Sequence, residues 1–394
     1  MKLQLTKDKT IEVKLPWEKS KGESSGAPKS GLAEIVGVSL FEGDARGCPI
    51  VRLLRKKDGV HLVSAGFVDS PAVSLPSNWD ESKIQPTWEL PSVYQVPQAA
   101  LAVTSPDMFI RQTTLDALTA APESSAAPVE KKKRLGVKRN AEEKKPEAKP
   151  AAAAAPVPFV PVSRDGARFV TAPMGDESFI LHTGLPEFQT LWLSRLLPEG
   201  RRPTACSLQT SPAAILNSLY LQPEFKADDG TAVAVFVTRS AIYFAGYRKG
   251  ELVLFRECPD VAGYDVMREL VKTELSVGDD LVDSILEDTL IDPRPALEPL
   301  VRPVLQQLQL SLDYLAQRHD VHVEKMFLMG LPAGAMYWSQ FAQETLGRAF
   351  VSPGAFEGLA LPTKAGAVPD LKPNESQVFL AAVGAAIAAM EVQA

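Results

Sequence analysis

The chain has few cysteines, few histidines and no long apolar run, and each shortage argues against a class of function. Cys48, Cys206 and Cys258 lie far apart without CxxC spacing, which argues against a disulfide framework or a zinc knuckle and favours a reducing compartment. The longest apolar run, 378–390, is mostly alanine and falls short of the roughly 20 residues that span a bilayer. Since the N-terminus also lacks the apolar stretch of a signal peptide, we expect a cytoplasmic chain without a transmembrane helix.

The usual catalytic and metal-binding signatures are missing as well. Of the four histidines only His319 and His322 are close together, and no Cys or Glu stands at ligand spacing from them. A histidine near the end of a helix is ordinarily explained by the helix dipole. GxSxG, HExxH and GxxxxGK[ST] do not occur, so the sequence shows no sign of the common hydrolases, zinc proteases or P-loop enzymes.

Charge is distributed unevenly along the chain. The net charge is −6, but residues 131–149 hold nine Lys/Arg against three Glu, which leaves 33 basic and 45 acidic residues and a charge of −12 for the rest. An acidic folded part disfavours nucleic acid as a partner, because affinity for phosphate backbones comes from basic surface. The run KKKRLGVKR is interpreted as solvated linker, with contact to anionic lipid headgroups left open.

With 394 residues, 45% of them hydrophobic, the chain is long enough for two or three lobes with cores of their own. Residues 1–30 are predicted to be a flexible polar tail, and 119–162, rich in Ala, Pro, Lys and Glu, a disordered insert. Within the tail, the alternating segment 11–17 (IEVKLPW) is either a disordered leader or a peptide that adds to a sheet edge.

Apolar runs of strand length recur in two groups of three. The first group is 33–40, 49–55 and 60–68, and the second is 232–237, 241–246 and 252–258. Gly-containing or other polar turns separate the runs, so each group predicts a β-meander. Two meanders that are each followed by helices predict a duplicated fold.

Other elements are expected between and after the meanders. Runs 99–104 and 108–113, joined by a tight turn, should begin a second small sheet. Helices are expected over 187–197, over 212–220 with Ser211 as N-cap, and over 304–317. A buried strand should follow at 325–329. The Ala-rich C-terminal helix should begin at Asn374, capped by this residue together with Gln377 at N3.

This pattern resembles the actin-like fold, and within it the pilus-assembly (PilM) branch. The matching segments are IVGVSLFEGDARGCPIVRL with HLVSAGFVDSP, AALAVTSPDMFIRQTTL, ELVLFRECPDVAGYDVMREL, LQQLQLSLDYLAQ, and FLMGLPAGAMYWSQFAQETLG to SPGAFEGL. The resemblance covers 33–394 except the insert. It implies an α/β, ribonuclease H-like duplicated fold with a small inserted α/β module.

The resemblance also implies a domain division. The first actin-like subdomain spans 31–91, and the second spans 225–394. The inserted module occupies 92–118 and 163–224, where the chain also returns to the first subdomain, with the 119–162 insert between its two parts.

In the family the first hairpin supplies an Asp and a Gly-rich turn that hold Mg²⁺ and the phosphates of ATP. Here Ser39 stands where the Asp is expected, and Phe41 blocks close approach of the backbone. Glu42 and Asp44 add negative charge beside the phosphate position. The first hairpin therefore looks degenerate.

The other two nucleotide motifs are altered too. Phe236 and Thr238 stand where the second hairpin should offer an Asp and a Gly. The adenosine-side glycine pair survives only as Gly330, with Gly334 further on, and both are equally explained as ordinary turn glycines. The resemblance thus implies a degenerate nucleotide site. No cofactor is expected, and ATP with Mg²⁺ is the alternative.

By resemblance the chain is a scaffold of a type IV pilus or type II secretion-like platform, peripheral at the inner membrane. It would bind the cytoplasmic peptide of a bitopic PilN-like partner. The patch implied for that peptide is Tyr94, Phe109, Arg111 and Trp192, although such residues are more often core. A homo-oligomer stays open.

Two other functions are weighed against this one. An active ATPase or sugar-kinase-like enzyme of the same fold would bind nucleotide in the presence of Mg²⁺. A division-type actin homologue would need a basic amphipathic C-terminus, whereas this chain ends AAIAAMEVQA.

Overall fold

The computed structural model describes residues 2–6, 9–12, 34–40, 46–71, 88–105, 107–114, 169–173, 179–194, 196–197, 203–227, 230–258, 261, 263–287, 290–364 and 366–392. Several sequence predictions lie outside these residues. They are Phe41, Glu42, Asp44, the 119–162 insert and most of the segment 11–17.

The first predicted meander forms the antiparallel half of a five-stranded sheet. Two parallel strands extend it on the other side of β3, giving the order β10-β6-β3-β4-β5. The strands are β3 (Glu34–Leu40), β4 (Cys48–Lys56), β5 (Gly59–Val68), β6 (Gln98–Val103) and β10 (Thr204–Thr210). β3 is almost fully buried because both faces of the sheet are covered.

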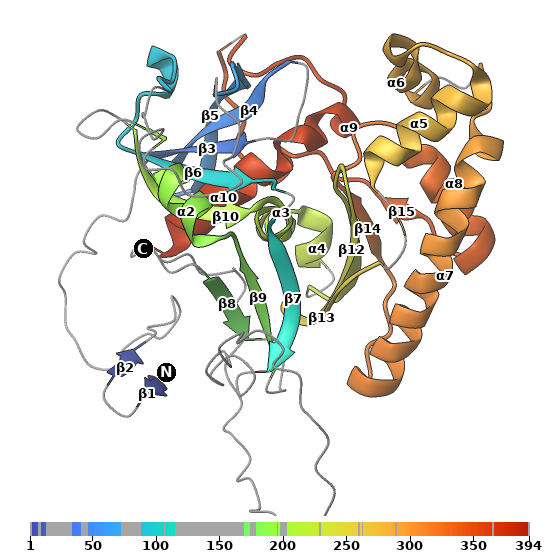
Figure 1. The fold of residues 1–394 in the computed structure, drawn as a ribbon, viewed down its shortest axis with the longest axis horizontal. Coiled ribbons are helices and arrows are strands. Elements are labelled where there is room, and N and C mark those ends of the chain that lie inside the picture. The colour runs from blue at the N-terminus through green and yellow to red at the C-terminus, as the bar shows by residue number, and fades with distance from the viewer. Residues whose placement is uncertain are drawn as a thin grey trace, which may run out of the picture.

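The second predicted meander builds a sheet of the same design. Its order is β13-β12-β11-β14-β15, again three antiparallel strands followed by two parallel ones. The strands are β11 (Ala232–Val237), β12 (Ile242–Arg248), β13 (Glu251–Glu257), β14 (Met326–Met329) and β15 (Phe350–Val351). The predicted duplication is therefore confirmed, and Figure 1 shows the two lobes side by side.

A third sheet lies between the two lobes in Figure 1, with the order β7-β9-β8. It consists of β7 (Phe109–Thr114), β8 (Phe169–Pro173) and β9 (Phe179–Gly184), followed by α2 (Glu187–Ser194). The prediction that the run 99–104 starts this sheet is wrong. That run is β6, which pairs with β3, so the inserted module begins only with β7.

Helices cover both large sheets. They are α3 (Ser211–Leu219), α4 (Pro223–Ala227), α5 (Tyr264–Leu275), α6 (Asp279–Glu287), α7 (Arg294–His319), α8 (Ala335–Leu346), α9 (Pro373–Ser376) and α10 (Leu380–Val392), with 3₁₀ turns η2 (Ser92–Tyr94) and η3 (Gln377–Phe379). Among these described helices, none combines the length and hydropathy needed to cross a membrane.

The C-terminal helix α10 returns to the first lobe and lies between β3 and α3. Glycine permits both contacts. A Cβ on Gly37 would lie 2.0 Å from the carbonyl oxygen of Ala382, and a Cβ on Gly384 would lie 1.8 Å from that of Ala214. The alanine-rich sequence of α10 is therefore explained by close packing against neighbours on two sides.

Three local predictions need correction. Two short strands, β1 (Lys2–Thr6) and β2 (Lys9–Glu12), pair antiparallel where a polar tail was expected, with a shift of register between Gln4 and Thr6. The N-cap of α3 is Thr210, and Ser211 is already helical. Asn374 lies inside α9, whose first turn is closed by Glu375 accepting a hydrogen bond from the Lys372 amide at 3.2 Å.

Candidate functional site

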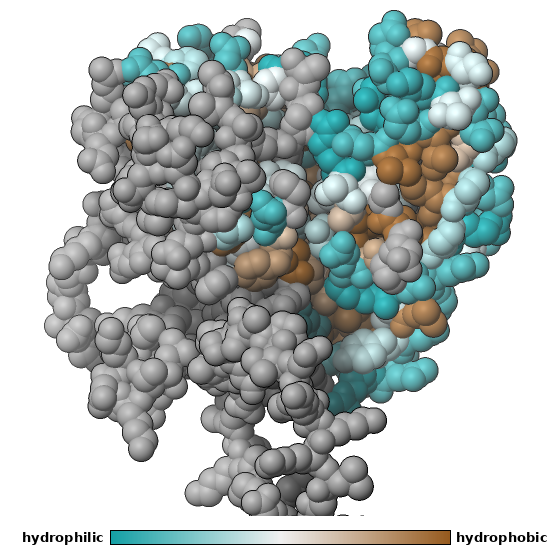
Figure 2. All heavy atoms as spheres, in the orientation of Figure 1, coloured by the Kyte–Doolittle hydropathy of each residue, from teal (hydrophilic) through white to brown (hydrophobic). Residues whose placement is uncertain are grey.

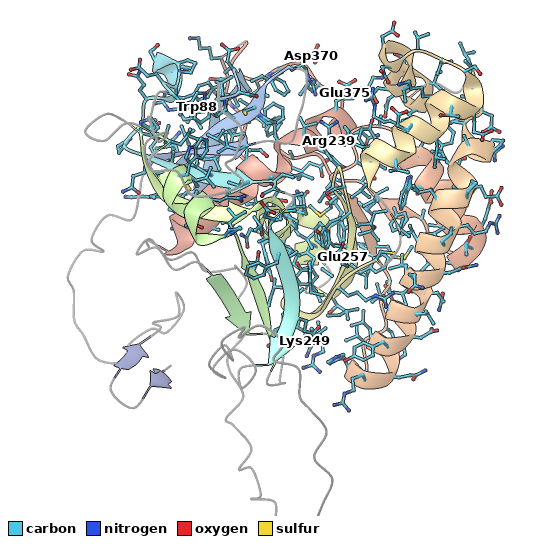
Figure 3. The ribbon with its side chains drawn as sticks, viewed as in Figure 1. Trp88, Arg239, Lys249, Glu257, Asp370 and Glu375 are labelled. Carbon is cyan, nitrogen blue, oxygen red and sulfur yellow. The ribbon has the colours of Figure 1, made fainter. Side chains whose placement is uncertain are left out.

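A cleft of about 820 Å³ separates the two lobes. Its walls come from β4 and α3 of the first lobe, from α5, α6 and the β11–β12 hairpin of the second lobe, and from α9, which links them. In Figure 3, Arg239 of the hairpin and Glu375 of α9 stand at this opening. This is the place where the two halves of a duplicated fold can act on one ligand.

Only part of the predicted nucleotide site faces the cleft. Thr238 and Gly330 line it. Ser39 is fully buried in β3, and its hydroxyl has no hydrogen-bond partner among the described residues. Phe236 is fully buried in the core on which α10 packs, because alternation along β11 turns it away from the second lobe's own helices. Gly334 is the N-cap of α8.

The side chain of Thr238 closes the turn of the β11–β12 hairpin. The Thr238 hydroxyl donates to the carbonyl oxygen of Ala241 at 2.8 Å and accepts from the Ala241 amide at 3.0 Å. A hairpin that holds a metal ion would carry a carboxylate here, because Mg²⁺ and Ca²⁺ bind to carboxylate oxygens. Here a neutral hydroxyl closes the turn and adds no negative charge for a cation.

Gly330 has a packing reason to be glycine. Its φ of +79° belongs to the left-handed region, and a Cβ would lie 2.4 Å from the carbonyl oxygen of Val237. The close approach of the β14 end to the β11 end therefore requires this residue whether or not a ligand binds.

The N-terminus of α8 holds an acidic side chain of the protein itself. The backbone amide of Gly334 hydrogen-bonds the carboxylate of Glu287, which α6 carries to this point. Helix N-termini attract anions because their free amides and dipole favour negative charge. Glu287 thus places the protein's own carboxyl group at this helix N-terminus, and burial raises the pKa of that group.

Two of the arginines that line the cleft, Arg268 and Arg239, are paired with carboxylates. Arg268 lies 3.0 Å from Asp283, whose carboxylate also accepts a 2.6 Å hydrogen bond from the Tyr264 hydroxyl. Burial, with the nearby Asp283 carboxylate, raises the pKa of Tyr264, so this phenol remains a donor. Arg239 pairs with Asp265 at 2.7 Å. Two arginines that would otherwise attract an anion are therefore engaged with the protein's own carboxylates.

We expect the Glu287→Gln variant to be slightly more stable than the parent near pH 7. Burial raises the folded-state pKa of Glu287 above its ordinary value of 4.5, so the folded protein binds more protons and its stability falls as pH rises through that window. A carboxamide oxygen can still accept from Gly334. The gain should be on the order of 0.5 kcal/mol, because water screens a partly exposed carboxylate.

Urea unfolding at pH 4 and pH 7.5 measures this, and the gain should be confined to the higher pH. A clear loss of stability at pH 7.5 would show that attraction between Glu287 and the helix N-terminus outweighs the cost of burying its charge.

The predicted peptide patch does not form one surface. Tyr94 and Trp192 are buried in the same core of the first lobe. Phe109 is half-buried at the start of β7, and Arg111 pairs with His182 in register between β7 and β9. The strand β7 lies beside β13 of the second lobe, so the strand that carries Phe109 and Arg111 runs along the seam between the module and the second lobe.

Sequence reasoning missed the acidic side chains by which α6 lines the cleft, Asp283 and Glu287. Asp279, Asp283 and Glu287 stand four residues apart on α6, a spacing that places them on one helix face. That spacing was the available signal. Among the residues that the structure describes, no group of three or more His, Cys, Asp or Glu is arranged to hold a metal ion.

No protein-family model matches the chain, and no curated protein matches it. Among solved structures, a chain of the PilM–PilN type IV pilus biogenesis complex is 13% identical, with 91% of this chain and 99% of that chain covered and a TM-score of 0.57. A Bacteroides thetaiotaomicron protein with an actin-like ATPase fold is 9% identical, with 88% and 95% covered and a TM-score of 0.37. The activator of 2-hydroxyisocaproyl-CoA dehydratase from Clostridium difficile is 8% identical, with 91% and 94% covered and a TM-score of 0.36.

The near-complete overlap with the first of these structures agrees with the two sheets of identical strand order around one cleft. The chain has the actin-like ATPase fold, with a small module inserted in its first lobe.

Proposed function

We propose that this protein is an adaptor of a type IV pilus or type II secretion-like platform that gathers a membrane partner on the cytoplasmic side. The observation that carries the proposal is the structural likeness to a chain of the PilM–PilN complex over 99% of that chain. The partner would be a bitopic inner-membrane protein similar to PilN, and attachment to it would hold the adaptor at the membrane surface.

The chemistry of the cleft favours an adaptor that works without hydrolysing ATP. Ser39 and Thr238 provide no carboxylate for a metal ion, and Ser39 is buried away from the cleft. Glu287 fills the N-terminus of α8, and Arg268 is paired with Asp283. These contacts support the proposal without any argument from Phe41, Glu42 and Asp44, which lie outside the described residues.

Peptide capture tests the adaptor function. The N-terminal cytoplasmic peptides of bitopic proteins encoded beside this chain should bind the full-length protein in fluorescence anisotropy without added nucleotide. We place the peptide against the half-exposed Phe109, so the Phe109→Asp variant should weaken capture by about tenfold, which corresponds to on the order of 1.4 kcal/mol of binding. Leu281→Asp, which changes an exposed leucine of α6, is the matched control.

Binding that appears only with ATP and Mg²⁺ would make the protein a nucleotide-gated switch. Failure of all such peptides to bind would remove the adaptor proposal.

We expect no measurable ATP site. Each missing charge-assisted contact forfeits roughly 1.5 to 3 kcal/mol, so two or three losses carry a micromolar site to millimolar or beyond. Isothermal titration with ATP and Mg²⁺ at tens of micromolar protein should show only heats of dilution. A dissociation constant below about 10 µM would return the chain to the enzyme alternative, an ATPase or sugar-kinase-like activity.

A further inference from the structure

The outer face of α7 exposes two large apolar side chains among its polar and charged residues. Leu310 is 56% exposed and Tyr314 39% exposed, and Pro299 and Pro303 are exposed on the same side of the helix. Figure 1 shows α7 along the outer side of the second lobe, away from the inserted module, and Figure 2 shows hydrophobic residues scattered among hydrophilic ones over this lobe. A surface helix normally turns charged residues outward.

The two halves of this face have different shapes. A shallow groove of about 340 Å³ runs along the first half, lined by Pro295, Glu298, Pro299, Arg302, Pro303 and Gln306. The second half instead projects the two large side chains of Leu310 and Tyr314. The first half of this face therefore has a shallow groove between its side chains. The second half has two projecting side chains, Leu310 and Tyr314, of the kind that could fill such a groove.

The prolines also change the hydrogen bonding of the first half. Pro299 and Pro303 have no amide hydrogen, so the carbonyl oxygens of Pro295 and Pro299 lack the donor that normally follows four residues later. A carbonyl oxygen without a backbone donor can accept a hydrogen bond from a hydroxyl group outside the helix.

Two copies of α7 match each other when they run antiparallel about a two-fold axis near Gln306. At 1.5 Å per residue, such an axis places Pro303 level with the second copy's Leu310. It places Pro299 level with the second copy's Tyr314, whose hydroxyl then lies beside the carbonyl oxygens without amide donors. Each copy fills the groove of the other, as an isologous interface requires.

The polar edge of the same face is also complementary. Arg302 and Asp313 lie along one edge of this face, about 100° around the helix from Pro303 and Tyr314. The two-fold axis brings Arg302 of each copy close to Asp313 of the other. In the single chain, Arg302 pairs with Glu298 and Asp313 accepts from Gln309, both at the surface, where such pairs rearrange at little cost.

We propose that this face of α7, Pro295 to Tyr314, is a dimerisation surface whose partner is a second copy of the same chain. A single antiparallel helix pair is small for an interface, so the dimer should be weak, with a dissociation constant on the order of 10 µM. Crowding of copies on a membrane platform would raise their local concentration above that value.

Sedimentation velocity of the full chain between about 1 and 200 µM tests the proposal, and the sedimentation coefficient should rise from monomer to dimer. The Leu310→Glu variant should weaken dimerisation at least about tenfold. The control is Leu361→Glu, which changes an equally exposed leucine on the first lobe's side and should leave the dimer intact. A chain that stays monomeric throughout, or a dimer that Leu310→Glu leaves unchanged, overturns the proposal.

A charge exchange tests the second copy as partner. Arg302→Asp and Asp313→Arg should each weaken the dimer several-fold, because each places like charges opposite one another across the two-fold axis. The double variant should restore the parent affinity to within about threefold. If both single variants weaken the dimer and the double variant does not recover it, the antiparallel register is wrong.

Discussion

Alanine at Gly384 is expected to destabilise the protein by roughly 3 kcal/mol or more. The added methyl carbon would lie 1.8 Å from the carbonyl oxygen of Ala214 and 3.0 Å from the amide of Ser218. These atoms belong to the backbone of α3, so no side-chain rotation relieves the contact, and α3 or α10 has to move away from its neighbours. Urea unfolding at neutral pH should show a much lower midpoint.

Gly278→Ala is the matched control. At that exposed position the nearest atom to an added Cβ is the carboxylate of Asp280, at 2.6 Å, and a flexible side chain can turn aside. The midpoint should change little. If Gly384→Ala behaves like Gly278→Ala, α10 does not pack against α3 as closely as described.

The duplicated meanders were predictable because each is encoded locally. Residues 33–68 and 232–258 each contain three apolar runs with turn residues between them, and antiparallel neighbours joined by short turns pair with one another. The fourth strand, β6, was assigned to the wrong sheet because its partner is not its neighbour in the sequence. It pairs in parallel with β3 across more than fifty residues, and no turn chemistry records such a partner.

The cleft was partly predictable. Thr238 and Gly330 were singled out because the resemblance to the actin-like fold places its second hairpin and its adenosine-side turn there, and both residues line the cleft. Phe236, which stands where the family has a carboxylate, does not face the cleft, because alternation along β11 directs it into the core beneath α10. Glu287 was missed because its role depends on α6 approaching the N-terminus of α8, and sequence spacing alone does not reveal contacts between helices.

Gln377 shows how far a local motif can mislead. The spacing from Asn374 suggested a capping pair, yet the Gln377 side chain is buried and directed to the second lobe. Its carboxamide oxygen accepts from the Leu331 amide at 2.9 Å, and its nitrogen donates to the carbonyl oxygens of Leu328 at 3.3 Å and Pro353 at 3.2 Å. One side chain at the start of the segment that leads into α10 thus satisfies three backbone groups of the other lobe.

Replacing Gln377 with methionine should therefore cost about 3 kcal/mol, because a side chain of similar length leaves three buried backbone groups without partners. Glutamate should also destabilise at pH 7.5, since its carboxylate keeps the contact with the Leu331 amide but faces two carbonyl oxygens. On acidification the protonated carboxyl group can donate to one of them. Burial beside carbonyl oxygens raises the pKa of this carboxyl group, so the folded state binds a proton that the unfolded state has released, and stability falls as pH rises.

Urea unfolding at pH 5 and pH 7.5 should show Gln377→Glu recovering at the lower pH while Gln377→Met does not. Asn374→Ala, on the exposed side of the same segment, should change the midpoint by less than about 0.5 kcal/mol; equal losses at Asn374 and Gln377 would mean that a helix cap, and not a link between the lobes, is what this segment provides.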